Sequence, residues 1–303
     1  MRNKIVIYSD RESFTSTSSL EGELKRLFNT HAFEIACVDR HQFAALSEIE
    51  DDTFLFVLPG INGEKCMYPD HIGKAGFSKI RDYVEQGGAY LGFCAGAYHA
   101  FSDIDYIPPF GRPKHRSKDK ALIEGTATGP IHHAYIPDNG LNNYSGCTTI
   151  SVHVEDTTPY DMLACYGNGP LLIPSSEDSL RTRVIARYND VEGNPPAILE
   201  RRVGQGLVIA SGIVPQYGAM HIAEESYGEM GKRGYGALVE LEKSLKPHED
   251  NRLRLMGMLR ASLLDHWNAL HPEEAKLQEA HREKMPTQSH LALPHNSSAA
   301  RPL

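Results

Sequence analysis

The feature that most restricts the fold is the short apolar run 89–93, which leads directly into Gly92-x-Cys94-x-Gly96. A strand that turns at once into a small-residue helix is typical of a nucleophile elbow, which holds one side chain in a strained, exposed position at the carboxyl end of a sheet. We expect Gly92 and Gly96 to be required, because a side chain there would collide with neighbouring backbone. The helix start favours the thiolate form of Cys94, which is the reactive form. The alternative is a buried structural cysteine between two packing glycines.

Apolar runs and helical patterns alternate around this turn. Strands are predicted at 5–8, 33–38 and 53–58, and helices at 20–28, 42–49 and 75–86, the last ending at Gly87-Gly88. This alternation predicts a doubly wound α/β fold, in which the ligand crevice lies at the carboxyl ends of the parallel strands. The 59–63 loop and Cys94 both lie at such ends, which favours the elbow interpretation.

The second half of the chain has strand patterns separated by turn residues. The predicted strands are 122–128, 148–154, 162–166, 184–188, 197–203 and 207–213, the last two forming a hairpin through Gly204-Gln205-Gly206. These segments add antiparallel strands to the parallel core. The stretch 103–120 is predicted to be a loop, and its basic cluster is interpreted as a solvated surface in preference to an anion site.

The chain divides into three parts on this basis. Residues 1–220 form an α/β domain, and residues 221–270 form a glycine-rich loop, a short helix and an amphipathic helix over 251–267 that packs on the same domain. Residues 271–303 form a polar tail that we expect to be disordered. A targeting or secretion signal in this tail stays open.

Composition excludes several classes of function. The net charge of −8 over 303 residues argues against a nucleic-acid partner, and no apolar run approaches the roughly 20 residues that span a membrane. The five cysteines have irregular spacing and no CxxC pair, which indicates free thiols in a reducing compartment. We therefore expect a cytoplasmic protein without a cofactor or a metal site. The sequence does not indicate an oligomeric state.

Motifs with specific residues extend over roughly residues 3–265. They are Val57-Leu58-Pro59-Gly60, the segment from Ile80 to Tyr98, Gly129-Pro130, Tyr166-Gly167-Asn168-Gly169-Pro170, Ile185-Ala186-Arg187-Tyr188, Val203-Gly204-Gln205-Gly206-Leu207 and the helix around Asn251-Arg252-Leu253. Together they resemble the domain family named for the N-terminal region of eukaryotic biotin–protein ligases, which is related to class I glutamine amidotransferases. The segment around Cys94 is the most specific part of the resemblance.

The resemblance implies a Rossmann-like, flavodoxin-like three-layer sandwich of the class I glutamine amidotransferase type, with an elbow cysteine and a parallel core sheet that carries added antiparallel strands. It does not imply biotin transfer, because ligase catalysis needs a Gly-Arg-Gly-Arg-type loop in a separate domain. The segment Gly231-Lys232-Arg233-Gly234 is not that motif.

One departure from the amidotransferase pattern concerns the catalytic base. In that pattern the strand after the final hairpin ends in His-Pro-Glu, where the histidine activates the cysteine and the glutamate orients the histidine. The matching strand here ends in Val214-Pro215-Gln216. Valine, which cannot accept a proton, stands at the base position, and Gln216 stands at the orienting position. A later His271-Pro272-Glu273 follows a helix and is interpreted as a coincidence.

A second departure concerns the oxyanion hole. The resemblance places its backbone N–H donors at Gly60, Ile61, Asn62 and Ala95. The family usually has two glycines after the proline, whereas this chain has Gly60-Ile61. A site that required positive φ at Ile61 would be strained.

Three functions follow as hypotheses. In the first, Cys94 attacks an amide or related acyl group of a small-molecule or peptide substrate and forms a thioester, with a base supplied from elsewhere. In the second, the fold is a catalytically inactive binding or interaction module, and in the third Cys94 is a redox sensor. Sequence alone does not rank the histidines that could act as the base in the first hypothesis, which are His99, His132, His133, His153 and His221.

Overall fold

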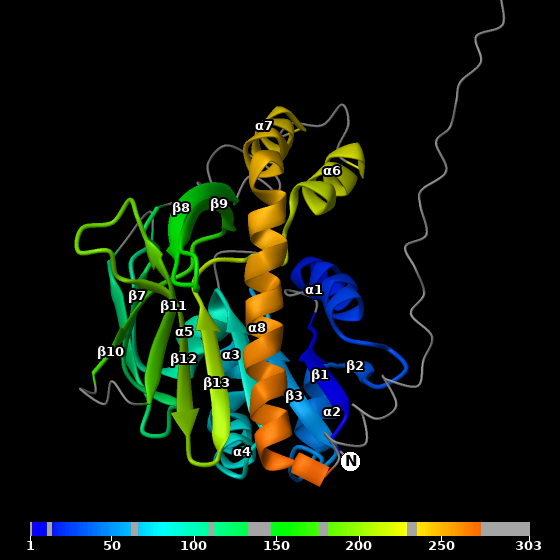
Figure 1. Ribbon diagram of the computed structural model, residues 1–303. Helices are drawn as coiled ribbons and strands as arrows, with labels where there is room; N and C mark the ends of the chain where they lie inside the picture. The colour runs from blue at the N-terminus through cyan, green and yellow to red at the C-terminus, as the bar shows by residue number, and fades with distance from the viewer. Residues whose placement is uncertain are drawn as a thin grey trace, which may run out of the picture.

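The computed structural model describes residues 2–10, 14–61, 66–108, 112–132, 147–175, 181–228 and 235–273 (Figure 1). The first part of the chain forms β1 (Lys4–Tyr8), α1 (Phe14–Leu27), β2 (Glu34–Val38), α2 (Arg40–Ala45), β3 (Thr53–Leu58), α3 (Tyr68–His71), α4 (Gly73–Glu85), β4 (Ala89–Phe93), α5 (Ala95–Ala100) and β5 (Phe101–Tyr106). The remainder forms β6 (Lys114–Ser117), β7 (Ile123–Gly129), β8 (Thr148–Val154), β9 (Tyr160–Tyr166), β10 (Leu171–Pro174), β11 (Thr182–Tyr188), β12 (Pro196–Val203), β13 (Gly206–Ser211), α6 (Ala219–Gly228), α7 (Tyr235–Leu245), the 3-10 helix Lys246–His248 and α8 (Glu249–Leu270).

Within the described residues, the larger sheet contains nine strands in the order β2-β1-β3-β4-β13-β12-β11-β8-β9. The five strands from β2 to β13 are parallel, and the other four are joined to them by antiparallel pairings. The prediction of an α/β fold with a parallel core and added antiparallel strands is therefore confirmed. The predicted hairpin is confirmed as well, since Val203 pairs with Gly206 and Gly204 has a φ of +57°.

Two apolar clusters cover the faces of this sheet. Ile5 and Ile7 of β1 belong to the cluster that includes α1 and α8, whereas Val6 and Tyr8 belong to the cluster that includes α4 and α5. This division follows from the strand geometry, because successive side chains point to opposite faces. The result is three layers, with α1 and α8 on one side of the sheet and α4 and α5 on the other (Figure 1).

The described part of the chain forms a second sheet of four strands, in the order β10-β7-β5-β6, and two of these strands, β5 and β6, fall largely within the stretch predicted to be a loop. The prediction of a loop over 103–120 is wrong, because β6 pairs antiparallel with β5 in this stretch. Polar side chains join the two strands: Ser117 Oγ donates to Asp103 Oδ1 over 2.6 Å, and His115 Nδ1 lies 2.6 Å from Asp105 Oδ1. An apolar alternation, the usual signal for a strand, is missing here.

The predicted glycine-rich loop before the last helix is also largely helical. α6 covers 219–228 and α7 covers 235–245, while residues 229–234 and the tail beyond residue 273 lie outside the described residues. Gly236 is tolerated in α7 because a Cβ built there meets nothing within 4 Å. Burial of Leu238, Leu241 and Leu245 offsets the low helix propensity of the glycine.

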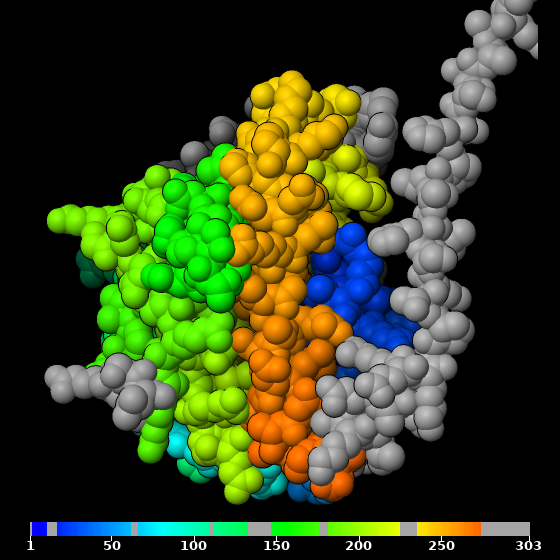
Figure 2. All heavy atoms as spheres, viewed as in Figure 1, coloured from blue at the N-terminus to red at the C-terminus, as the bar shows by residue number. Residues whose placement is uncertain are grey.

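The amphipathic helix predicted at 251–267 is confirmed as α8, which crosses one face of the sheet. Figure 2 shows it as a continuous band between the strands β8 and β9 and the N-terminal segment that includes α1. The Trp267 indole N–H donates to the Arg2 carbonyl over 2.7 Å and so ties the end of α8 to the start of β1. Among the described residues, no helix combines the length and apolarity needed to cross a membrane.

His266 on the buried side of α8 is expected to make the stability of the protein depend on pH. Its Nε2 lies 3.0 Å from the Gly87 carbonyl, and its Nδ1 contacts the Arg202 guanidinium. Burial lowers the pKa of His266 to about 4. Between pH 6.5 and about 4 the unfolded chain binds a proton at this residue that the folded chain excludes, so stability falls as the pH falls through this window.

We expect the titration of His266 to lower the free energy of unfolding by up to about 3 kcal/mol between pH 6.5 and 4. Urea unfolding at several pH values measures it, and His266→Gln, which keeps a donor and an acceptor but does not titrate, should show a shallower decline than the wild-type chain. Equal pH dependence in the two proteins would contradict the assignment.

Candidate functional site

The turn at Cys94 has the strained geometry that the sequence predicts. Cys94 has φ 48° and ψ −103°, between the end of β4 and the first residue of α5. Its N–H donates to the Ser211 carbonyl over 2.8 Å, which places the turn beside the end of β13. A Cβ built at Gly96 would lie 2.0 Å from the Leu58 carbonyl oxygen, and one at Gly92 would lie 2.7 Å from Gly96 backbone. The requirement for both glycines is confirmed.

The prediction that the elbow exposes its side chain is wrong, because the fold buries Cys94. The residue is 7% exposed, and its thiol donates to the Gly167 carbonyl over 3.1 Å. Burial raises the pKa of Cys94 to about 12, although an interaction with the Ala95 N–H acts in the opposite direction. The predicted lowering of the thiol pKa by the helix start is therefore wrong, because desolvation of the thiolate outweighs the short helix α5.

The segment that receives the thiol, residues 167–170, is fixed at four successive carbonyls by four different side chains. Besides Cys94 on Gly167, the donors are the hydroxyl groups of Tyr98 to Asn168 (3.2 Å), Tyr166 to Gly169 (2.8 Å) and Tyr188 to Pro170 (2.8 Å). Asn168 has a φ of 62°. These hydrogen bonds hold the segment 167–170 against the elbow.

Sequence reasoning did not assign a role to these tyrosines. Each of these tyrosines is the first or last residue of a motif that carries the family resemblance, and this position is the sequence feature that could have indicated a role for them. The chain separates Cys94 from Gly167 by 73 residues, and no local pattern indicates that they meet.

The two altered triad positions follow β13. Val214 is 4% exposed, and its N–H donates to the Cys165 carbonyl over 3.0 Å. Gln216 is fully buried. Val214 belongs to the same apolar cluster as Cys94 and Ile213, so the position that carries a base in the amidotransferase pattern presents an aliphatic side chain to the core.

The histidines considered as replacement bases lie in separate places. His99 Nε2 lies 3.3 Å from Cys66 Sγ, and its ring stacks on Phe77 at a centroid distance of 5.1 Å. His153 pairs with Asp161 on the surface, His221 lies on α6, and the His132 ring lies 6.2 Å from the Tyr166 ring. His133 is outside the described residues. None of the described histidines hydrogen-bonds to the Cys94 thiol.

The oxyanion positions are only partly described. Gly60 and Ala95 are buried and Ile61 is half-buried, whereas Asn62 lies outside the described residues. Among the described non-glycine residues, positive φ occurs at Cys94, Asn168 and Asn194 and not at Ile61. The strain anticipated at Ile61 is therefore not present. His271, from the second His-Pro-Glu, packs its ring 5.4 Å from Trp267 at the end of α8.

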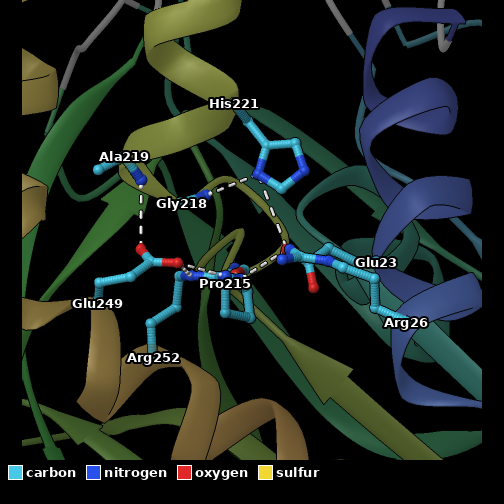
Figure 3. Close-up of polar contacts among 8 residues, drawn as sticks. All are labelled: Glu23, Arg26, Pro215, Gly218, Ala219, His221, Glu249 and Arg252. Carbon is cyan, nitrogen blue, oxygen red and sulfur yellow. Dashed lines mark hydrogen bonds and ion pairs between the residues drawn. The ribbon is translucent and has the colours of Figure 1, made fainter. Parts of the chain in front are cut away.

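The segment after Val214 is held by a buried charged cluster, which we call the Glu23–Arg252 cluster (Figure 3). It consists of Glu23 and Arg26 of α1, His221 of α6, Glu249 and Arg252 of α8, and the backbone of residues 215–219. Arg252 Nη1 donates to Glu23 Oε1 and to the Pro215 carbonyl, both over 2.9 Å. The exposed fractions of Glu23 and Arg252 are 1% and 4%.

The other members complete the charge balance of this cluster. Glu249 accepts from Arg252 Nη2 over 2.6 Å and from the Ala219 N–H over 3.3 Å, and Arg26 pairs with Glu23. The Gly218 N–H donates to His221 Nδ1 over 3.3 Å, and burial lowers the pKa of this histidine. His221 is thus oriented toward Glu23 and the 215–219 backbone, as Figure 3 shows.

The described residues contain no group of three or more histidine, cysteine, aspartate or glutamate side chains placed to hold a metal ion. The candidate site consists of the elbow cysteine, the 167–170 segment that accepts its hydrogen bond, and the aliphatic Val214.

The sequence of the chain is similar to those of two known proteins. It is 37% identical over 163 residues to an uncharacterized protein of Chlamydia muridarum (strain MoPn / Nigg), covering 54% of this chain and 60% of that protein. It is 30% identical over 170 residues to the biotin–protein ligase of Schizosaccharomyces pombe, covering 55% of this chain and 26% of the ligase. The matched part is less than two thirds of either relative.

Solved structures with similar folds include two glutamine amidotransferases. The one from Methylobacillus flagellatus has a TM-score of 0.49 at 12% identity, covering 88% of this chain and 95% of its own. The one from Thermotoga maritima has a TM-score of 0.48 at 12% identity, covering 88% and 97%. The family model described as biotin-protein ligase, N terminal, matches residues 3–287, nearly the whole chain. The chain therefore belongs to the biotin–protein ligase N-terminal family.

Proposed function

We propose that this chain is a binding or interaction module on an amidotransferase-like scaffold, in which Cys94 remains a protonated thiol and does not act as a nucleophile. The observation that carries the proposal is the hydrogen bond from the Cys94 thiol to the Gly167 carbonyl. A thiolate cannot donate this bond, and a carbonyl oxygen beside a thiolate would be repelled by it. The contact therefore stabilises the unreactive form.

The surroundings of the thiol support the same conclusion. Three tyrosine hydroxyls fix the 167–170 segment that accepts the bond, so the segment is held in place independently of Cys94. Val214 cannot take the proton, and removal of a catalytic base typically costs about 10²–10⁴-fold in rate. The side chains at the two positions that carry the base and its orienting group in the amidotransferase pattern are buried here.

Alkylation measures the state of this thiol. With a pKa of about 12, the thiolate fraction of Cys94 near pH 8 is about 10³-fold lower than that of an ordinary thiol. We expect iodoacetamide to modify Cys94 at least about 10²-fold more slowly than a free cysteine peptide, as followed by peptide mass spectrometry over time.

The same chain after denaturation is the control for the intrinsic reactivity of the Cys94 peptide, and the exposed Cys37 is the control for reagent access in the folded protein. Alkylation of folded Cys94 faster than the free peptide would overturn the proposal.

A second candidate function is cysteine-dependent chemistry on a small-molecule or peptide amide, which the positive φ of Cys94 favours. Backbone strain of this kind costs about 1–3 kcal/mol and is concentrated at active sites. In this reaction the thiolate would attack the amide carbonyl, forming a thioester and releasing the amine with a proton, and water would then hydrolyse the thioester. Cys94→Ser should abolish such turnover while Cys37→Ser retains it. The binding proposal instead predicts that both variants behave as the wild-type chain.

A further inference from the structure

A cavity of about 540 Å³ lies between α3, α4, α5 and the segment that follows β6. Its size falls in the range of small-molecule sites, about 300–1,000 Å³. The wall combines an apolar part, which includes Phe77, with basic side chains from two elements: Lys74 comes from α4, and Arg116, Lys118 and Lys120 come from β6 and the residues after it. The cavity is lined by residues other than Cys94 and is distinct from the elbow.

The basic side chains of this wall are not neutralised by the protein. Among the residues that the structure describes, Lys74, Arg116 and Lys120 form no ion pair, although ion pairs occupy many other lysines and arginines of the chain. The carboxylate in the lining is Asp119, against four basic groups. In a chain with a net charge of −8, this local excess of positive charge is unusual. It favours an anion as the occupant.

Lys118 is held at the wall in a fixed position. Its Nζ donates to the His99 carbonyl over 2.9 Å and lies 4.6 Å from the centroid of the Phe77 ring. Its partners are thus a carbonyl and an aromatic face, neither of which supplies a full negative charge. Burial lowers the pKa of Lys118 to about 7, and an anion beside the amine would raise this pKa and favour the charged form.

His99 lines the same cavity and retains an unused polar atom. The residue is 6% exposed, its Nε2 contacts Cys66, and its buried Nδ1 has no hydrogen-bond partner. Burial and the neighbouring cations Lys118 and Arg116 hold the pKa of His99 well below its ordinary value. The ring is therefore neutral and does not add to the positive charge.

We propose that this cavity binds a phosphorylated small organic molecule, with the phosphate at Arg116 and Lys118 and the organic part against the apolar wall to which Pro69 and Phe77 contribute. A planar guanidinium and an ammonium together match the geometry of a phosphate group. The excess of positive charge fits a dianion better than a monocarboxylate, and the volume is larger than inorganic phosphate alone requires. The site would give the proposed binding module a ligand, yet it does not depend on the state of Cys94.

Titration calorimetry on the full chain tests the site. The probes are inorganic phosphate, pyrophosphate, glucose 6-phosphate, AMP, and the matching neutral compounds glucose and adenosine. We expect at least one organic phosphate to bind with a dissociation constant below about 1 mM and more tightly than inorganic phosphate, and we expect no binding of the neutral compounds. If none of the phosphorylated probes binds at about 10 mM, the proposal is wrong.

Variants locate the binding. Arg116→Gln and Lys118→Met should each lower the affinity for the organic phosphate about ten- to a hundredfold, because each removes one charge-assisted hydrogen bond. Lys114→Gln, which removes the same charge two residues from Arg116 but outside the cavity lining, should change the affinity less than about twofold. If Lys114→Gln lowers the affinity as much as Arg116→Gln and Lys118→Met do, the binding reflects general charge attraction and the proposed site is wrong.

Lysine acetylation of the wild-type chain gives a readout that needs no variant. Mass spectrometry should show that the bound organic phosphate slows acetylation of Lys118 and leaves that of Lys114 unchanged. Unchanged acetylation of Lys118 at saturating ligand would overturn the assignment. Neither outcome depends on the alkylation of Cys94, so failure of this site and failure of the proposed function are distinguishable.

Discussion

Replacing Arg252 with leucine is expected to lower the free energy of unfolding by about 3–5 kcal/mol. The guanidinium is 4% exposed and joins Glu23, Glu249 and the Pro215 carbonyl. Its removal leaves the Glu23 carboxylate, 1% exposed, with the half-exposed Arg26 as its remaining arginine partner, and the cost of this poorly compensated buried charge dominates the loss. Urea unfolding followed by circular dichroism measures the change, provided that the m-value stays constant.

Arg254→Leu is the matched control for this prediction. Arg254 lies on the same helix two residues further on and pairs with Asp156, but it is partly exposed. We expect a change within about 1 kcal/mol, as for other ion pairs near the surface. A double-mutant cycle with Glu23→Gln should give a coupling of about 0.5–3 kcal/mol. If Arg252→Leu costs no more than Arg254→Leu, the cluster does not hold the 215–219 segment in the way we describe.

The fold could be predicted where the sequence carries a periodic apolar signal. β1, β3, β4 and the β12–β13 hairpin appear as predicted because their residues are apolar on both faces or alternate regularly. β6 was missed because four exposed polar residues carry no such signal, and cross-strand hydrogen bonds to β5 make the strand instead. α1 begins six residues before its predicted start, in a serine- and threonine-rich stretch that local propensity does not favour as helix.

The candidate site shows a similar division. The turn at Cys94 could be predicted because glycine spacing and strand-to-helix patterning are local properties. The protonation state of its thiol could not, because it is decided by the Gly167 carbonyl and by burial, both of which require the tertiary fold. The Glu23–Arg252 cluster joins residues 229 positions apart, and neither residue belongs to a motif that indicates the other.

The segment that contains the two altered positions, Val214 and Gln216, is held in place by contacts with the rest of the molecule. The 214–219 segment, which in the amidotransferase pattern carries the base and its orienting group, is fixed here by the core at Val214 and by Arg252 at Pro215. The segment thus retains a defined position without the catalytic side chains. A segment that is held in place in this way, with valine and glutamine at these two positions, agrees with the binding function that we propose.

Replacing Gly96 with alanine is expected to lower the free energy of unfolding by about 3 kcal/mol, the upper part of the usual range for overpacking. The new Cβ would lie 2.0 Å from the Leu58 carbonyl oxygen and 2.9 Å from its carbonyl carbon. Both obstacles are backbone atoms of β3, so α5 must move away from the sheet. Thermal and urea unfolding measure the loss, and faster alkylation of Cys94 would report the displaced turn.

The control for Gly96→Ala is Gly257→Ala in α8, where a built Cβ meets nothing within 4 Å. Since alanine is the better helix former and restricts the unfolded chain, this change should stabilise the protein by up to about 1 kcal/mol. The two substitutions should therefore change the free energy of unfolding in opposite directions. Both glycines lie in helices, so helix propensity favours alanine at both sites and the difference comes from the contacts of the new Cβ. A Gly96→Ala protein as stable as the wild-type chain, with Cys94 equally protected, would show that α5 and β3 are not in the close contact on which the elbow depends.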